Sequence, residues 1–470
     1  MKLRECSRMR TRRALTAPLA MGLAVTSLAT FSGSAPASAS SSSGGITITL
    51  AASQSYVLDS AALAKKFYGT IKSEFQKQHP GVTLQIVDLP GGANDIVTKL
   101  SLLYRQPSSA PDVAQFASAQ AGLFASSGYL APMDSYLKTA SWWKGFAAIS
   151  KSEGAYKGKV YYVSQGDNTN GLIYNMTMFR KAGIRDPWQP KNVADIISAA
   201  KKLKAALPGV IPFWLPNGTA LGTEGLLQGG LNGYILGSKN PTIYDSSTKK
   251  WVVDSPGIRQ AFGFFRTIAA DGLGAPESLL FSPSAGTAWA QLFKDGKLAM
   301  GSGANYWPGL WTKTVNAPYW SEAGKTMGAT RLPTFSGAAP NVASTFSGWG
   351  VGISAASTHK KLAFDLISLM QSKTNSINTA NWGGFIPPDK SSWTNPLYTS
   401  FAPGATLFAN IEPYATLTPV GSAFTMWAQG MNEGTQMFVQ NPKTTVAQAI
   451  QTAKNYITQQ LGASNVETLK

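Results

Sequence analysis

The sequence has 470 residues, 44% of them hydrophobic and 11% aromatic, which is typical of a folded chain and excludes disorder over most of its length. This length exceeds what one hydrophobic core usually serves, so we expect two lobes. The formal net charge is +18, but charged residues make up only 14% of the chain and the Lys and Arg are scattered, so the basic patch of a nucleic-acid binder is not indicated.

The N-terminus has the pattern of a secretory signal peptide. Its basic residues, Lys2, Arg4, Arg8, Arg10, Arg12 and Arg13, precede an apolar stretch at 14–31 and the small-residue motif Ala37-Ser38-Ala39. We expect residues 1–39 to be cleaved off and residues 40–45 to form a flexible leader. An uncleaved anchor is the alternative, although the apolar stretch does not clearly reach the ~20 residues of a spanning helix.

The only cysteine is Cys6, which would leave with the signal peptide. The exported protein would then have no disulfide, no thiolate nucleophile and no Cys-ligated metal. It would also lack a cysteine for lipid attachment just after the apolar stretch. We therefore expect a periplasmic or extracellular protein, associated with the cell surface and not lipidated.

The next predicted elements alternate between strands and helices. Residues 46–50 are predicted as a strand and 61–78 as an amphipathic helix, in which Leu63, Phe67, Ile71 and Phe75 repeat every four residues. A turn at 79–81 leads to a strand at 82–87, and a helix at 95–104, a strand at 112–116 and a short helix at 120–126 follow. This order indicates a mainly parallel sheet covered by helices on both faces.

A second group of elements is predicted from residue 159 onward. Strands are expected at 160–163, 171–175 and 350–354, and helices at 193–206, 257–270, 359–372 and 445–460. We find no internal repeat. The whole chain is therefore predicted to be an α/β protein.

Catalytic and metal-binding patterns are not evident. The two histidines fall in a predicted turn (His79) and at a predicted helix start (His359), so neither is placed as the base of a serine hydrolase. Of the scarce acids only Asp167 and Glu224 fall near a plausible cleft, which does not indicate the carboxyl pair of a glycoside hydrolase. The segment 91–94 lacks the Lys-Ser/Thr ending of a phosphate-binding loop. We expect no enzyme, metal or cofactor; the scarcity of acids would also suit an acidic habitat.

Several short sequence motifs occur in an order that resembles one protein family. They are FQKQHPGVT at 75–83, APDVAQ at 110–115, GYLAPMD at 128–134, YKGKVYYV at 156–163, GLIYN at 171–175 with FRKAGI at 179–184, FKDGKLAM at 293–300, and SGWGVGIS at 347–354 with HKKLA at 359–363 and GGFIP at 383–387. Together they resemble the bacterial extracellular solute-binding proteins (family 1 type) of carbohydrate ABC transporters. Each phrase alone is unspecific, but their order spans nearly the whole exported chain.

The resemblance implies a two-lobed periplasmic-binding-protein-like fold (type II) with a hinge and a ligand cleft between the lobes. By analogy the N-terminal lobe holds residues 46–162 plus 328–372, and the C-terminal lobe holds 163–327 plus 373–470. The implied function is capture of a sugar or oligosaccharide for the membrane permease of an ABC importer. We expect a monomer that does not bind nucleic acid.

Candidate aromatic platforms follow from the chemistry of sugars, which present flat C–H faces and a rim of hydroxyls. Trp349 lies between two glycines, which we expect to leave room around its ring. Tyr306 and Trp307 follow a Gly-rich stretch where the resemblance implies a stacking aromatic. Phe116, at a predicted strand end, and Trp382, before Gly383-Gly384, are further candidates that could instead be core residues.

Candidate polar partners are side chains that follow the ends of predicted strands. They are Gln54 after the first strand, Gln115 and Gln120 around the strand at 112–116, and Asp167, Asn168 and Asn170 beyond the strand at 160–163. Asp167 could accept hydroxyl hydrogen bonds, which are stronger to a charged acceptor. Asn and Asp also form turns for backbone reasons alone, so each could instead be structural.

The sequence leaves two alternative functions open. An anionic compound, such as a sugar phosphate or a glycerol phosphate ester, fits the basic charge and the same architecture. A cell-surface polysaccharide-binding module is the weaker alternative, and it would bind polymer rather than a soluble ligand.

Overall fold

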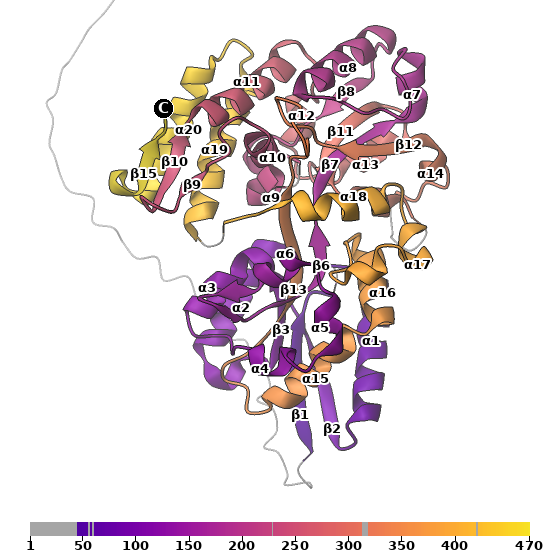
Figure 1. Ribbon diagram of the computed structural model, residues 1–470, viewed down its shortest axis with the longest axis vertical. Coiled ribbons are helices and arrows are strands. Elements are labelled where there is room, and N and C mark those ends of the chain that lie inside the picture. Colours follow the sequence, from indigo (N-terminus) through magenta and orange to yellow (C-terminus); the bar gives the residue numbers. More distant parts are fainter. Residues whose placement is uncertain (1–44, 55–56, 59–60, 228, 313–317, 420–421) are drawn as a thin grey trace, which may run out of the picture. The chain divides into compact units, whose positions relative to one another are not determined.

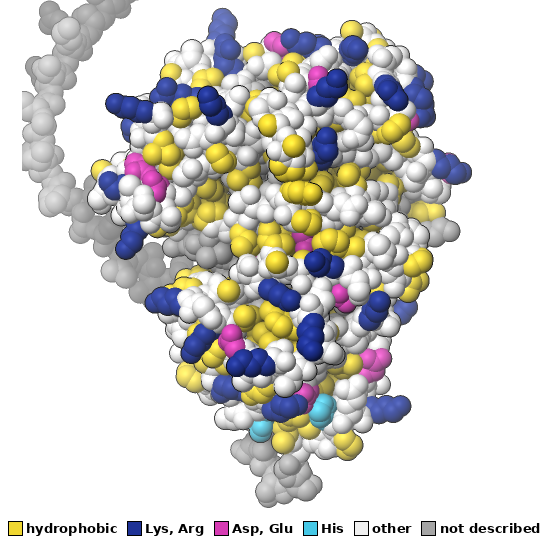
Figure 2. Space-filling model, in the orientation of Figure 1, with side chains coloured by type: hydrophobic (Ala, Val, Ile, Leu, Met, Phe, Trp, Pro, Cys, Tyr) yellow, Lys and Arg dark blue, Asp and Glu magenta, His cyan; other side chains and the backbone are white. Residues whose placement is uncertain are grey.

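The computed structural model describes residues 45–54, 57–58, 61–227, 229–312, 318–419 and 422–470. The expected signal peptide and leader residues 40–44 lie outside the described residues. None of the helices in the described part of the chain combines the length and apolar character that a membrane span requires. Lys and Arg side chains are dispersed over the face shown in Figure 2, with few Asp and Glu among them.

The first sheet begins with the expected parallel unit near the N-terminus. β1 (Ile46–Ala52) pairs in parallel with both β2 (Val82–Asp88) and β3 (Val113–Ala117). The helix between β1 and β2 is α1 (Ala61–Gln78), which buries Phe67, Ile71 and Phe75, so the four-residue repeat that predicted it is confirmed. The expected helices at 95–104 and 120–126 are α2 (Ala93–Arg105) and α3 (Ala121–Ser126).

Later parts of the chain complete this sheet, whose order is β14-β13-β3-β1-β2 with β6 also on β13. β13 (Thr345–Ile353) is antiparallel to β3 and to β6 (Val163–Asn168), and its first residues pair with β14 (Thr416–Leu417). Between β3 and β6 the chain forms α4 (Asp134–Leu137), α5 (Ser141–Gly145), α6 (Ala148–Glu153) and the hairpin β4 (Ala155–Tyr156) and β5 (Lys159–Val160). The expected helix at 359–372 is α15 (Lys360–Met370).

The second sheet has the order β12-β7-β11-β8. β7 (Asn170–Asn175) is antiparallel to both β11 (Leu298–Ala304) and β12 (Met327–Arg331), and β8 (Ile211–Trp214) is parallel to β11. The helices that follow its strands or link them are α7 (Met176–Lys181), α8 (Val193–Ala206), α12 (Glu277–Leu280), α13 (Ala288–Lys294) and α14 (Ala323–Thr326). We call the parts built around the two sheets the first and second lobes.

A helical layer extends the second lobe. It contains α9 (Gly222–Leu227), α10 (Leu231–Leu236), α11 (Pro256–Ala270), α19 (Ser422–Gln440) and α20 (Val446–Leu461), with a small sheet of β9 (Tyr244–Asp245), β10 (Lys250–Asp254) and β15 (Val466–Thr468). Leu203, Phe262 and Trp427 belong to one buried cluster that joins this layer to the helices of the second sheet. The expected helices at 193–206, 257–270 and 445–460 are confirmed here.

Two segments cross from one lobe to the other, side by side (Figure 1). β6 belongs to the first sheet and β7 to the second, with only Thr169 between them. The second crossing segment enters β13 at Thr345, whose backbone N–H donates to Asn170 Oδ1 at 3.0 Å. Asn170 in turn donates its backbone N–H to Ser344 Oγ at 2.8 Å. The crossing segments are therefore bonded to each other at the midpoint.

The chain segments in the lobes differ from the expected boundaries in four places. Two strands expected in the second lobe, β6 and β14, pair with β13 in the first sheet. β12, expected in the first lobe, pairs with β7 in the second sheet. The helix α16 (Lys373–Gly383), expected in the second lobe, packs Trp382 edge-on against Phe67 of α1. The chain returns to the second lobe with α17 (Pro396–Thr399) and α18 (Ala405–Ile411), of which α18 packs on β12. Strand pairing and helix packing, which join residues far apart in sequence, set these boundaries.

Candidate functional site

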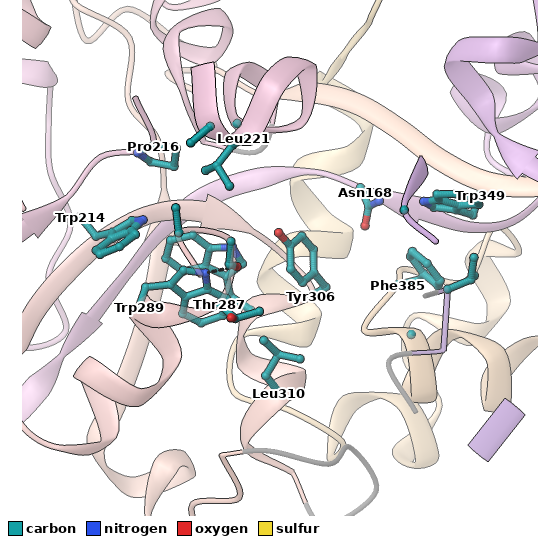
Figure 3. A pocket seen from close by; sticks show the side chains of 18 of the residues that line it. Asn168, Trp214, Pro216, Leu221, Thr287, Trp289, Tyr306, Leu310, Trp349 and Phe385 are labelled. Atoms are coloured by element: carbon teal, nitrogen blue, oxygen red, sulfur yellow. Dashed lines mark hydrogen bonds between the residues drawn. The ribbon is translucent and has the colours of Figure 1, made fainter. Parts of the chain in front are cut away.

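A cavity of about 560 Å³ is lined by residues from both lobes. Asn168 of β6, Trp349 of β13 and Phe385 come from the side of the first sheet, and Trp214 of β8 and Tyr306 come from the side of the second. Figure 3 shows Trp214 and Trp349 at opposite sides of the site with Tyr306 between them. The volume falls in the range of small-molecule pockets, roughly 300–1,000 Å³.

Stacked tryptophans form one wall of the cavity. The rings of Trp289 and Trp307 are parallel to within 9° with their centroids 3.8 Å apart, and Trp311 packs edge-on against Trp289 at 5.9 Å. A side chain at Gly301 or Gly303 of β11 would collide with the Trp307 ring. The glycines of β11 therefore let the Trp307 ring lie flat on the strand, and the end of β11 becomes an aromatic surface.

Glycines also position the aromatic rings on the first-lobe side. A side chain at Gly166 or Gly383 would collide with the Phe385 ring. Beside Trp349, a side chain at Gly348 would meet the backbone of β6. We expected the glycines next to Trp349 to leave room around its ring, but they allow β6 and β13 to approach closely. The ring lines the cavity and is only 7% exposed.

Polar atoms without protein partners occur among the buried lining residues. Asn168 is 5% exposed, and its Oδ1 has no hydrogen-bond partner among the described residues. The same holds for the indole Nε1 atoms of Trp214 and Trp307. Buried polar groups are nearly always paired, so these atoms are an acceptor and two donors that a ligand with hydroxyl groups could satisfy.

Asn305, which we did not predict, connects the crossing strand to two loops of the cavity. Its Oδ1 accepts a hydrogen bond from the backbone N–H of Thr169 at 2.9 Å. Its Nδ2 donates to the backbone oxygen of Gly384 at 2.7 Å and to that of Asp167 at 3.3 Å. Because Asn305 precedes Tyr306 and Gly384 precedes Phe385, these bonds hold two lining aromatics in place from behind.

The structure brings four of the candidate residues to the cavity, namely Asn168, Tyr306, Trp307 and Trp349. The other candidates do not line it. Gln54 is half-buried and donates its backbone N–H to Asp88, and Gln120 is half-buried before α3. Trp382 packs against α1, with the Lys66 Nζ 5.9 Å from the centre of its ring.

The remaining candidates are buried inside the fold. Gln115 accepts a hydrogen bond from the Tyr68 hydroxyl and donates to Gln165 Oε1 at 2.9 Å. Phe116 is fully buried against Phe124 and Tyr162. Asn170 bonds the two crossing segments as described above. We expected these residues near strand ends, but Gln115 and Phe116 lie inside β3 and Asn170 begins β7, and all three side chains contact neighbouring elements of the protein.

Asp167 is fully buried and is not among the residues that line the cavity. Its Oδ1 accepts a hydrogen bond from the Ser164 hydroxyl at 2.5 Å, and its Oδ2 accepts one from Ser150 at 2.7 Å. Burial raises the pKa of Asp167 to about 7, although the two serine hydroxyls favour the ionised form. Its charge therefore responds to changes near neutral pH.

Several lining residues were not among the candidates. Trp214, Trp289 and Phe385 are at most 6% exposed and line the cavity. Trp214 ends a short buried strand directly before a Leu-Pro-Asn-Gly loop, a position that could have identified it. Trp289 lies inside a helix, and nothing in the local sequence distinguishes it from a core residue. Within the described residues, no group of three or more His, Cys, Asp or Glu side chains is arranged to hold a metal ion.

Comparison with protein families gives a match over residues 70–403 to the bacterial extracellular solute-binding proteins. Binding proteins of Brucella abortus and Brucella suis are each 24% identical over 245 residues, which is 52% of this chain. The match covers 56% of the length of these relatives, so the chain spans about half of them.

Comparison with solved structures shows the same fold in sugar-binding proteins. A maltose-bound MalE3 protein of T. maritima has a TM-score of 0.71 at 19% identity, covering 88% of this chain and all of that one. The sugar-binding protein MalE of Xanthomonas citri has a TM-score of 0.72 at 17% identity, covering 88% of this chain and 98% of that one. The GacH receptor of Streptomyces glaucescens, solved with acarbose, has a TM-score of 0.69 at 20% identity, covering 90% and 100%. At these identities the likeness establishes the two-lobed α/β fold.

Proposed function

Because this chain belongs to the bacterial extracellular solute-binding proteins, we propose that it captures a sugar or oligosaccharide in the cavity between its lobes and delivers it to the membrane permease of an ABC importer. The observation that carries the proposal is the aromatic surface of the cavity, to which Trp349 and Phe385 contribute from one lobe and Trp214 and Tyr306 from the other. Aromatic faces stack on the C–H faces of sugar rings. The solved structures of similar fold that contain maltose or acarbose agree with this ligand class.

Ligand capture would involve closure about the two crossing segments. A ligand that contacts Asn168 and Trp349 on one side and Tyr306 on the other gains contacts only when both lobes enclose it. The crossing segments β6 and β13, bonded through Asn170 and Thr345, would bend during this closure, together with the return of the chain from α16 to α17. We propose that the importer recognises the closed arrangement of the two lobes.

The experiment is a thermal-shift and calorimetric screen of the purified exported protein against monosaccharides, oligosaccharides, sugar phosphates and glycerol phosphate esters. A ligand at a hundredfold excess over its Kd should stabilise the native state by about 2.7 kcal/mol. Trp349→Ala should abolish the shift, whereas Trp382→Ala, a tryptophan outside the cavity, should keep it. A thermal shift only with anionic compounds would mean that the ligand is anionic and not a sugar. Binding only to insoluble polysaccharide would mean that the protein binds polymer and does not serve an importer.

We further infer that the protein is exported, cleaved after Ala39 and active as a monomer. Its family membership and the basic-apolar-small pattern of residues 1–39 support export. Mass spectrometry of the secreted protein should find Ser40 as the first residue, and light scattering after gel filtration should give the mass of one chain. Retention of residues 1–39 in the membrane fraction would instead indicate an uncleaved anchor.

A further inference from the structure

Three carboxyl groups meet inside the protein beside the crossing segments. Glu153 ends α6, Asp167 lies in β6, and Glu412 begins the 3₁₀ helix η6 (Glu412–Tyr414). Their residues are 8%, 0% and 0% exposed, respectively. We call them the carboxyl cluster. The elements that carry them belong to different parts of the chain, so only the tertiary structure brings the three groups together.

The two contacts of the Ser150 hydroxyl fit a protonated carboxyl group in this cluster. The Ser150 hydroxyl donates to Asp167 Oδ2 at 2.7 Å and lies 3.4 Å from Glu412 Oε1. A hydroxyl has a single proton, so it cannot donate to both carboxylates. If Glu412 is protonated, its own O–H can donate to the Ser150 oxygen, and both contacts are then satisfied. The geometry thus fits an ionised Asp167 beside a neutral Glu412.

The other carboxyl oxygens are poorly compensated. Glu412 Oε2 and both oxygens of Glu153 have no partner of normal hydrogen-bond geometry among the described residues, although the Ser118 hydroxyl favours the ionised form of Glu153. The other titratable groups that act on the cluster are the buried phenols of Tyr162 and Tyr398 and the exposed Lys390. Adding a second negative charge here would therefore be costly without water.

One residue of the cluster borders a second cavity. Glu153 lines this cavity of about 210 Å³ together with Ser118, Phe346 and Leu417. A carboxyl that becomes ionised can be solvated if α6 and β13 separate at this cavity. Gly348 of β13 lies close to both α6 and β6, because a side chain at this position would meet Glu153 Oε2 and the backbone of Gly166.

The cluster is joined directly to residues that line the ligand cavity. Asp167 precedes Asn168, and its backbone N–H and C=O each bond Ile386 at 2.9 Å, next to Phe385. On the other crossing strand, Gly348 precedes Trp349. A separation of β6, β13 and the loop at Ile386 would therefore displace the first-lobe side of the cavity.

We propose that the carboxyl cluster is a positioning device whose bound protons hold β6, β13 and the loop at Ile386 together, so that ligand binding weakens as these protons are lost. The proposal rests on the proposed function for its ligand and adds Asp167, Glu153 and Glu412 as positioning residues that do not touch it. Lower pH outside the membrane then favours capture, and higher pH favours release.

The direction of the pKa changes agrees with this geometry. Burial, and after it the charge of the neighbouring Asp167, raise the pKa of Glu412 to about 10. Burial and the charge of Asp167 also hold the pKa of Glu153 well above its ordinary value. The first ionisation is expected at Asp167, which has two hydroxyl donors, and the later ones at the two glutamates.

The test compares the wild-type protein with Glu412→Gln, in which an amide replaces the neutral acid and can still donate to Ser150. For a sugar found in the screen, the Kd of the wild type should rise at least tenfold from pH 5.5 to pH 8.5. The Kd of Glu412→Gln, which keeps Asp167 and Glu153, should rise by a factor at least threefold smaller. Glu153→Gln is the second variant, in case the first folds poorly. Glu322→Gln, at an exposed ion pair with Lys325, is the matched control and should keep the wild-type ratio.

Amide hydrogen exchange without ligand gives an independent measurement. After correction for intrinsic exchange, residues 163–168 and 345–349 should exchange faster at pH 8.5 than at pH 5.5 in the wild type, and this increase should be smaller in Glu412→Gln. If no sugar binds at any pH, the proposed function fails while this measurement still decides the role of the cluster. A pH-independent wild type, or both variants keeping the wild-type pH dependence of exchange, would overturn the proposal.

Discussion

Replacing Glu412 with Gln should make the stability of the protein less dependent on pH. The pKa of Glu412 is raised in the folded protein from 4.5 to about 10, mainly by burial. A group whose folded pKa is raised contributes stability that is fully present below its unfolded pKa and is lost as the pH rises toward the folded pKa. The folded protein holds about one more proton here than the unfolded chain, so the free energy of unfolding falls by about 1.4 kcal/mol per pH unit.

Urea unfolding followed by tryptophan fluorescence measures this effect. Between pH 5.5 and pH 7.5 the contribution of Glu412 to the free energy of unfolding should fall by about 3 kcal/mol, and Glu412→Gln should remove that part of the slope. At pH 7.5 the variant should be more stable than the wild type, which is an unusual result for a change at a buried residue. Equal slopes for the two proteins, with unchanged m values, would show that Glu412 is not protonated in the folded state and would refute the reasoning.

Two further predictions concern the aromatic side of the cavity. Tyr306→Ala should weaken sugar binding at least tenfold by calorimetry, while Tyr306→Phe, which keeps the ring, should stay within about threefold; equal losses would mean that the hydroxyl rather than the ring binds the ligand. Gly303→Ala should destabilise the protein by about 1–3 kcal/mol because its methyl group would collide with the Trp307 ring. Gly324→Ala, which meets nothing within 4 Å, should have little effect, and similar urea midpoints for the two variants would contradict this packing argument.

The elements with a strong local pattern were predictable from the sequence. The helix α1 follows a four-residue apolar repeat that ends at His79-Pro80-Gly81, and the structure begins and ends it at the expected residues. The strand β12 was not foreseen, since its residues carry no alternating pattern and it is stabilised by pairing with β7. Local periodicity reports one face of an element, whereas strand pairing depends on residues far away in the chain.

Candidate site residues could be predicted only in part. Tyr306 and Trp349 were found because glycines and family phrases surround them, and both line the cavity. Gln115 is predicted as a polar partner because it falls near the end of an expected strand, yet its amide is bonded to Tyr68 and Gln165. Trp289 was missed because a tryptophan in a helix has the same local pattern in a core as beside a cavity. The direction of a side chain depends on the neighbouring residues that bond to it or pack against it.

The sequence by itself determined the class of this protein. Alternating strand and helix patterns indicate an α/β fold, and the order of short sequence motifs indicates the solute-binding family. Both signals are carried by residues close together in the chain. The tertiary structure alone decided which aromatics share the cavity and that Glu153, Asp167 and Glu412 meet beside the crossing strands. Burial and the distances between charges depend on contacts between distant segments, and these have no local signature.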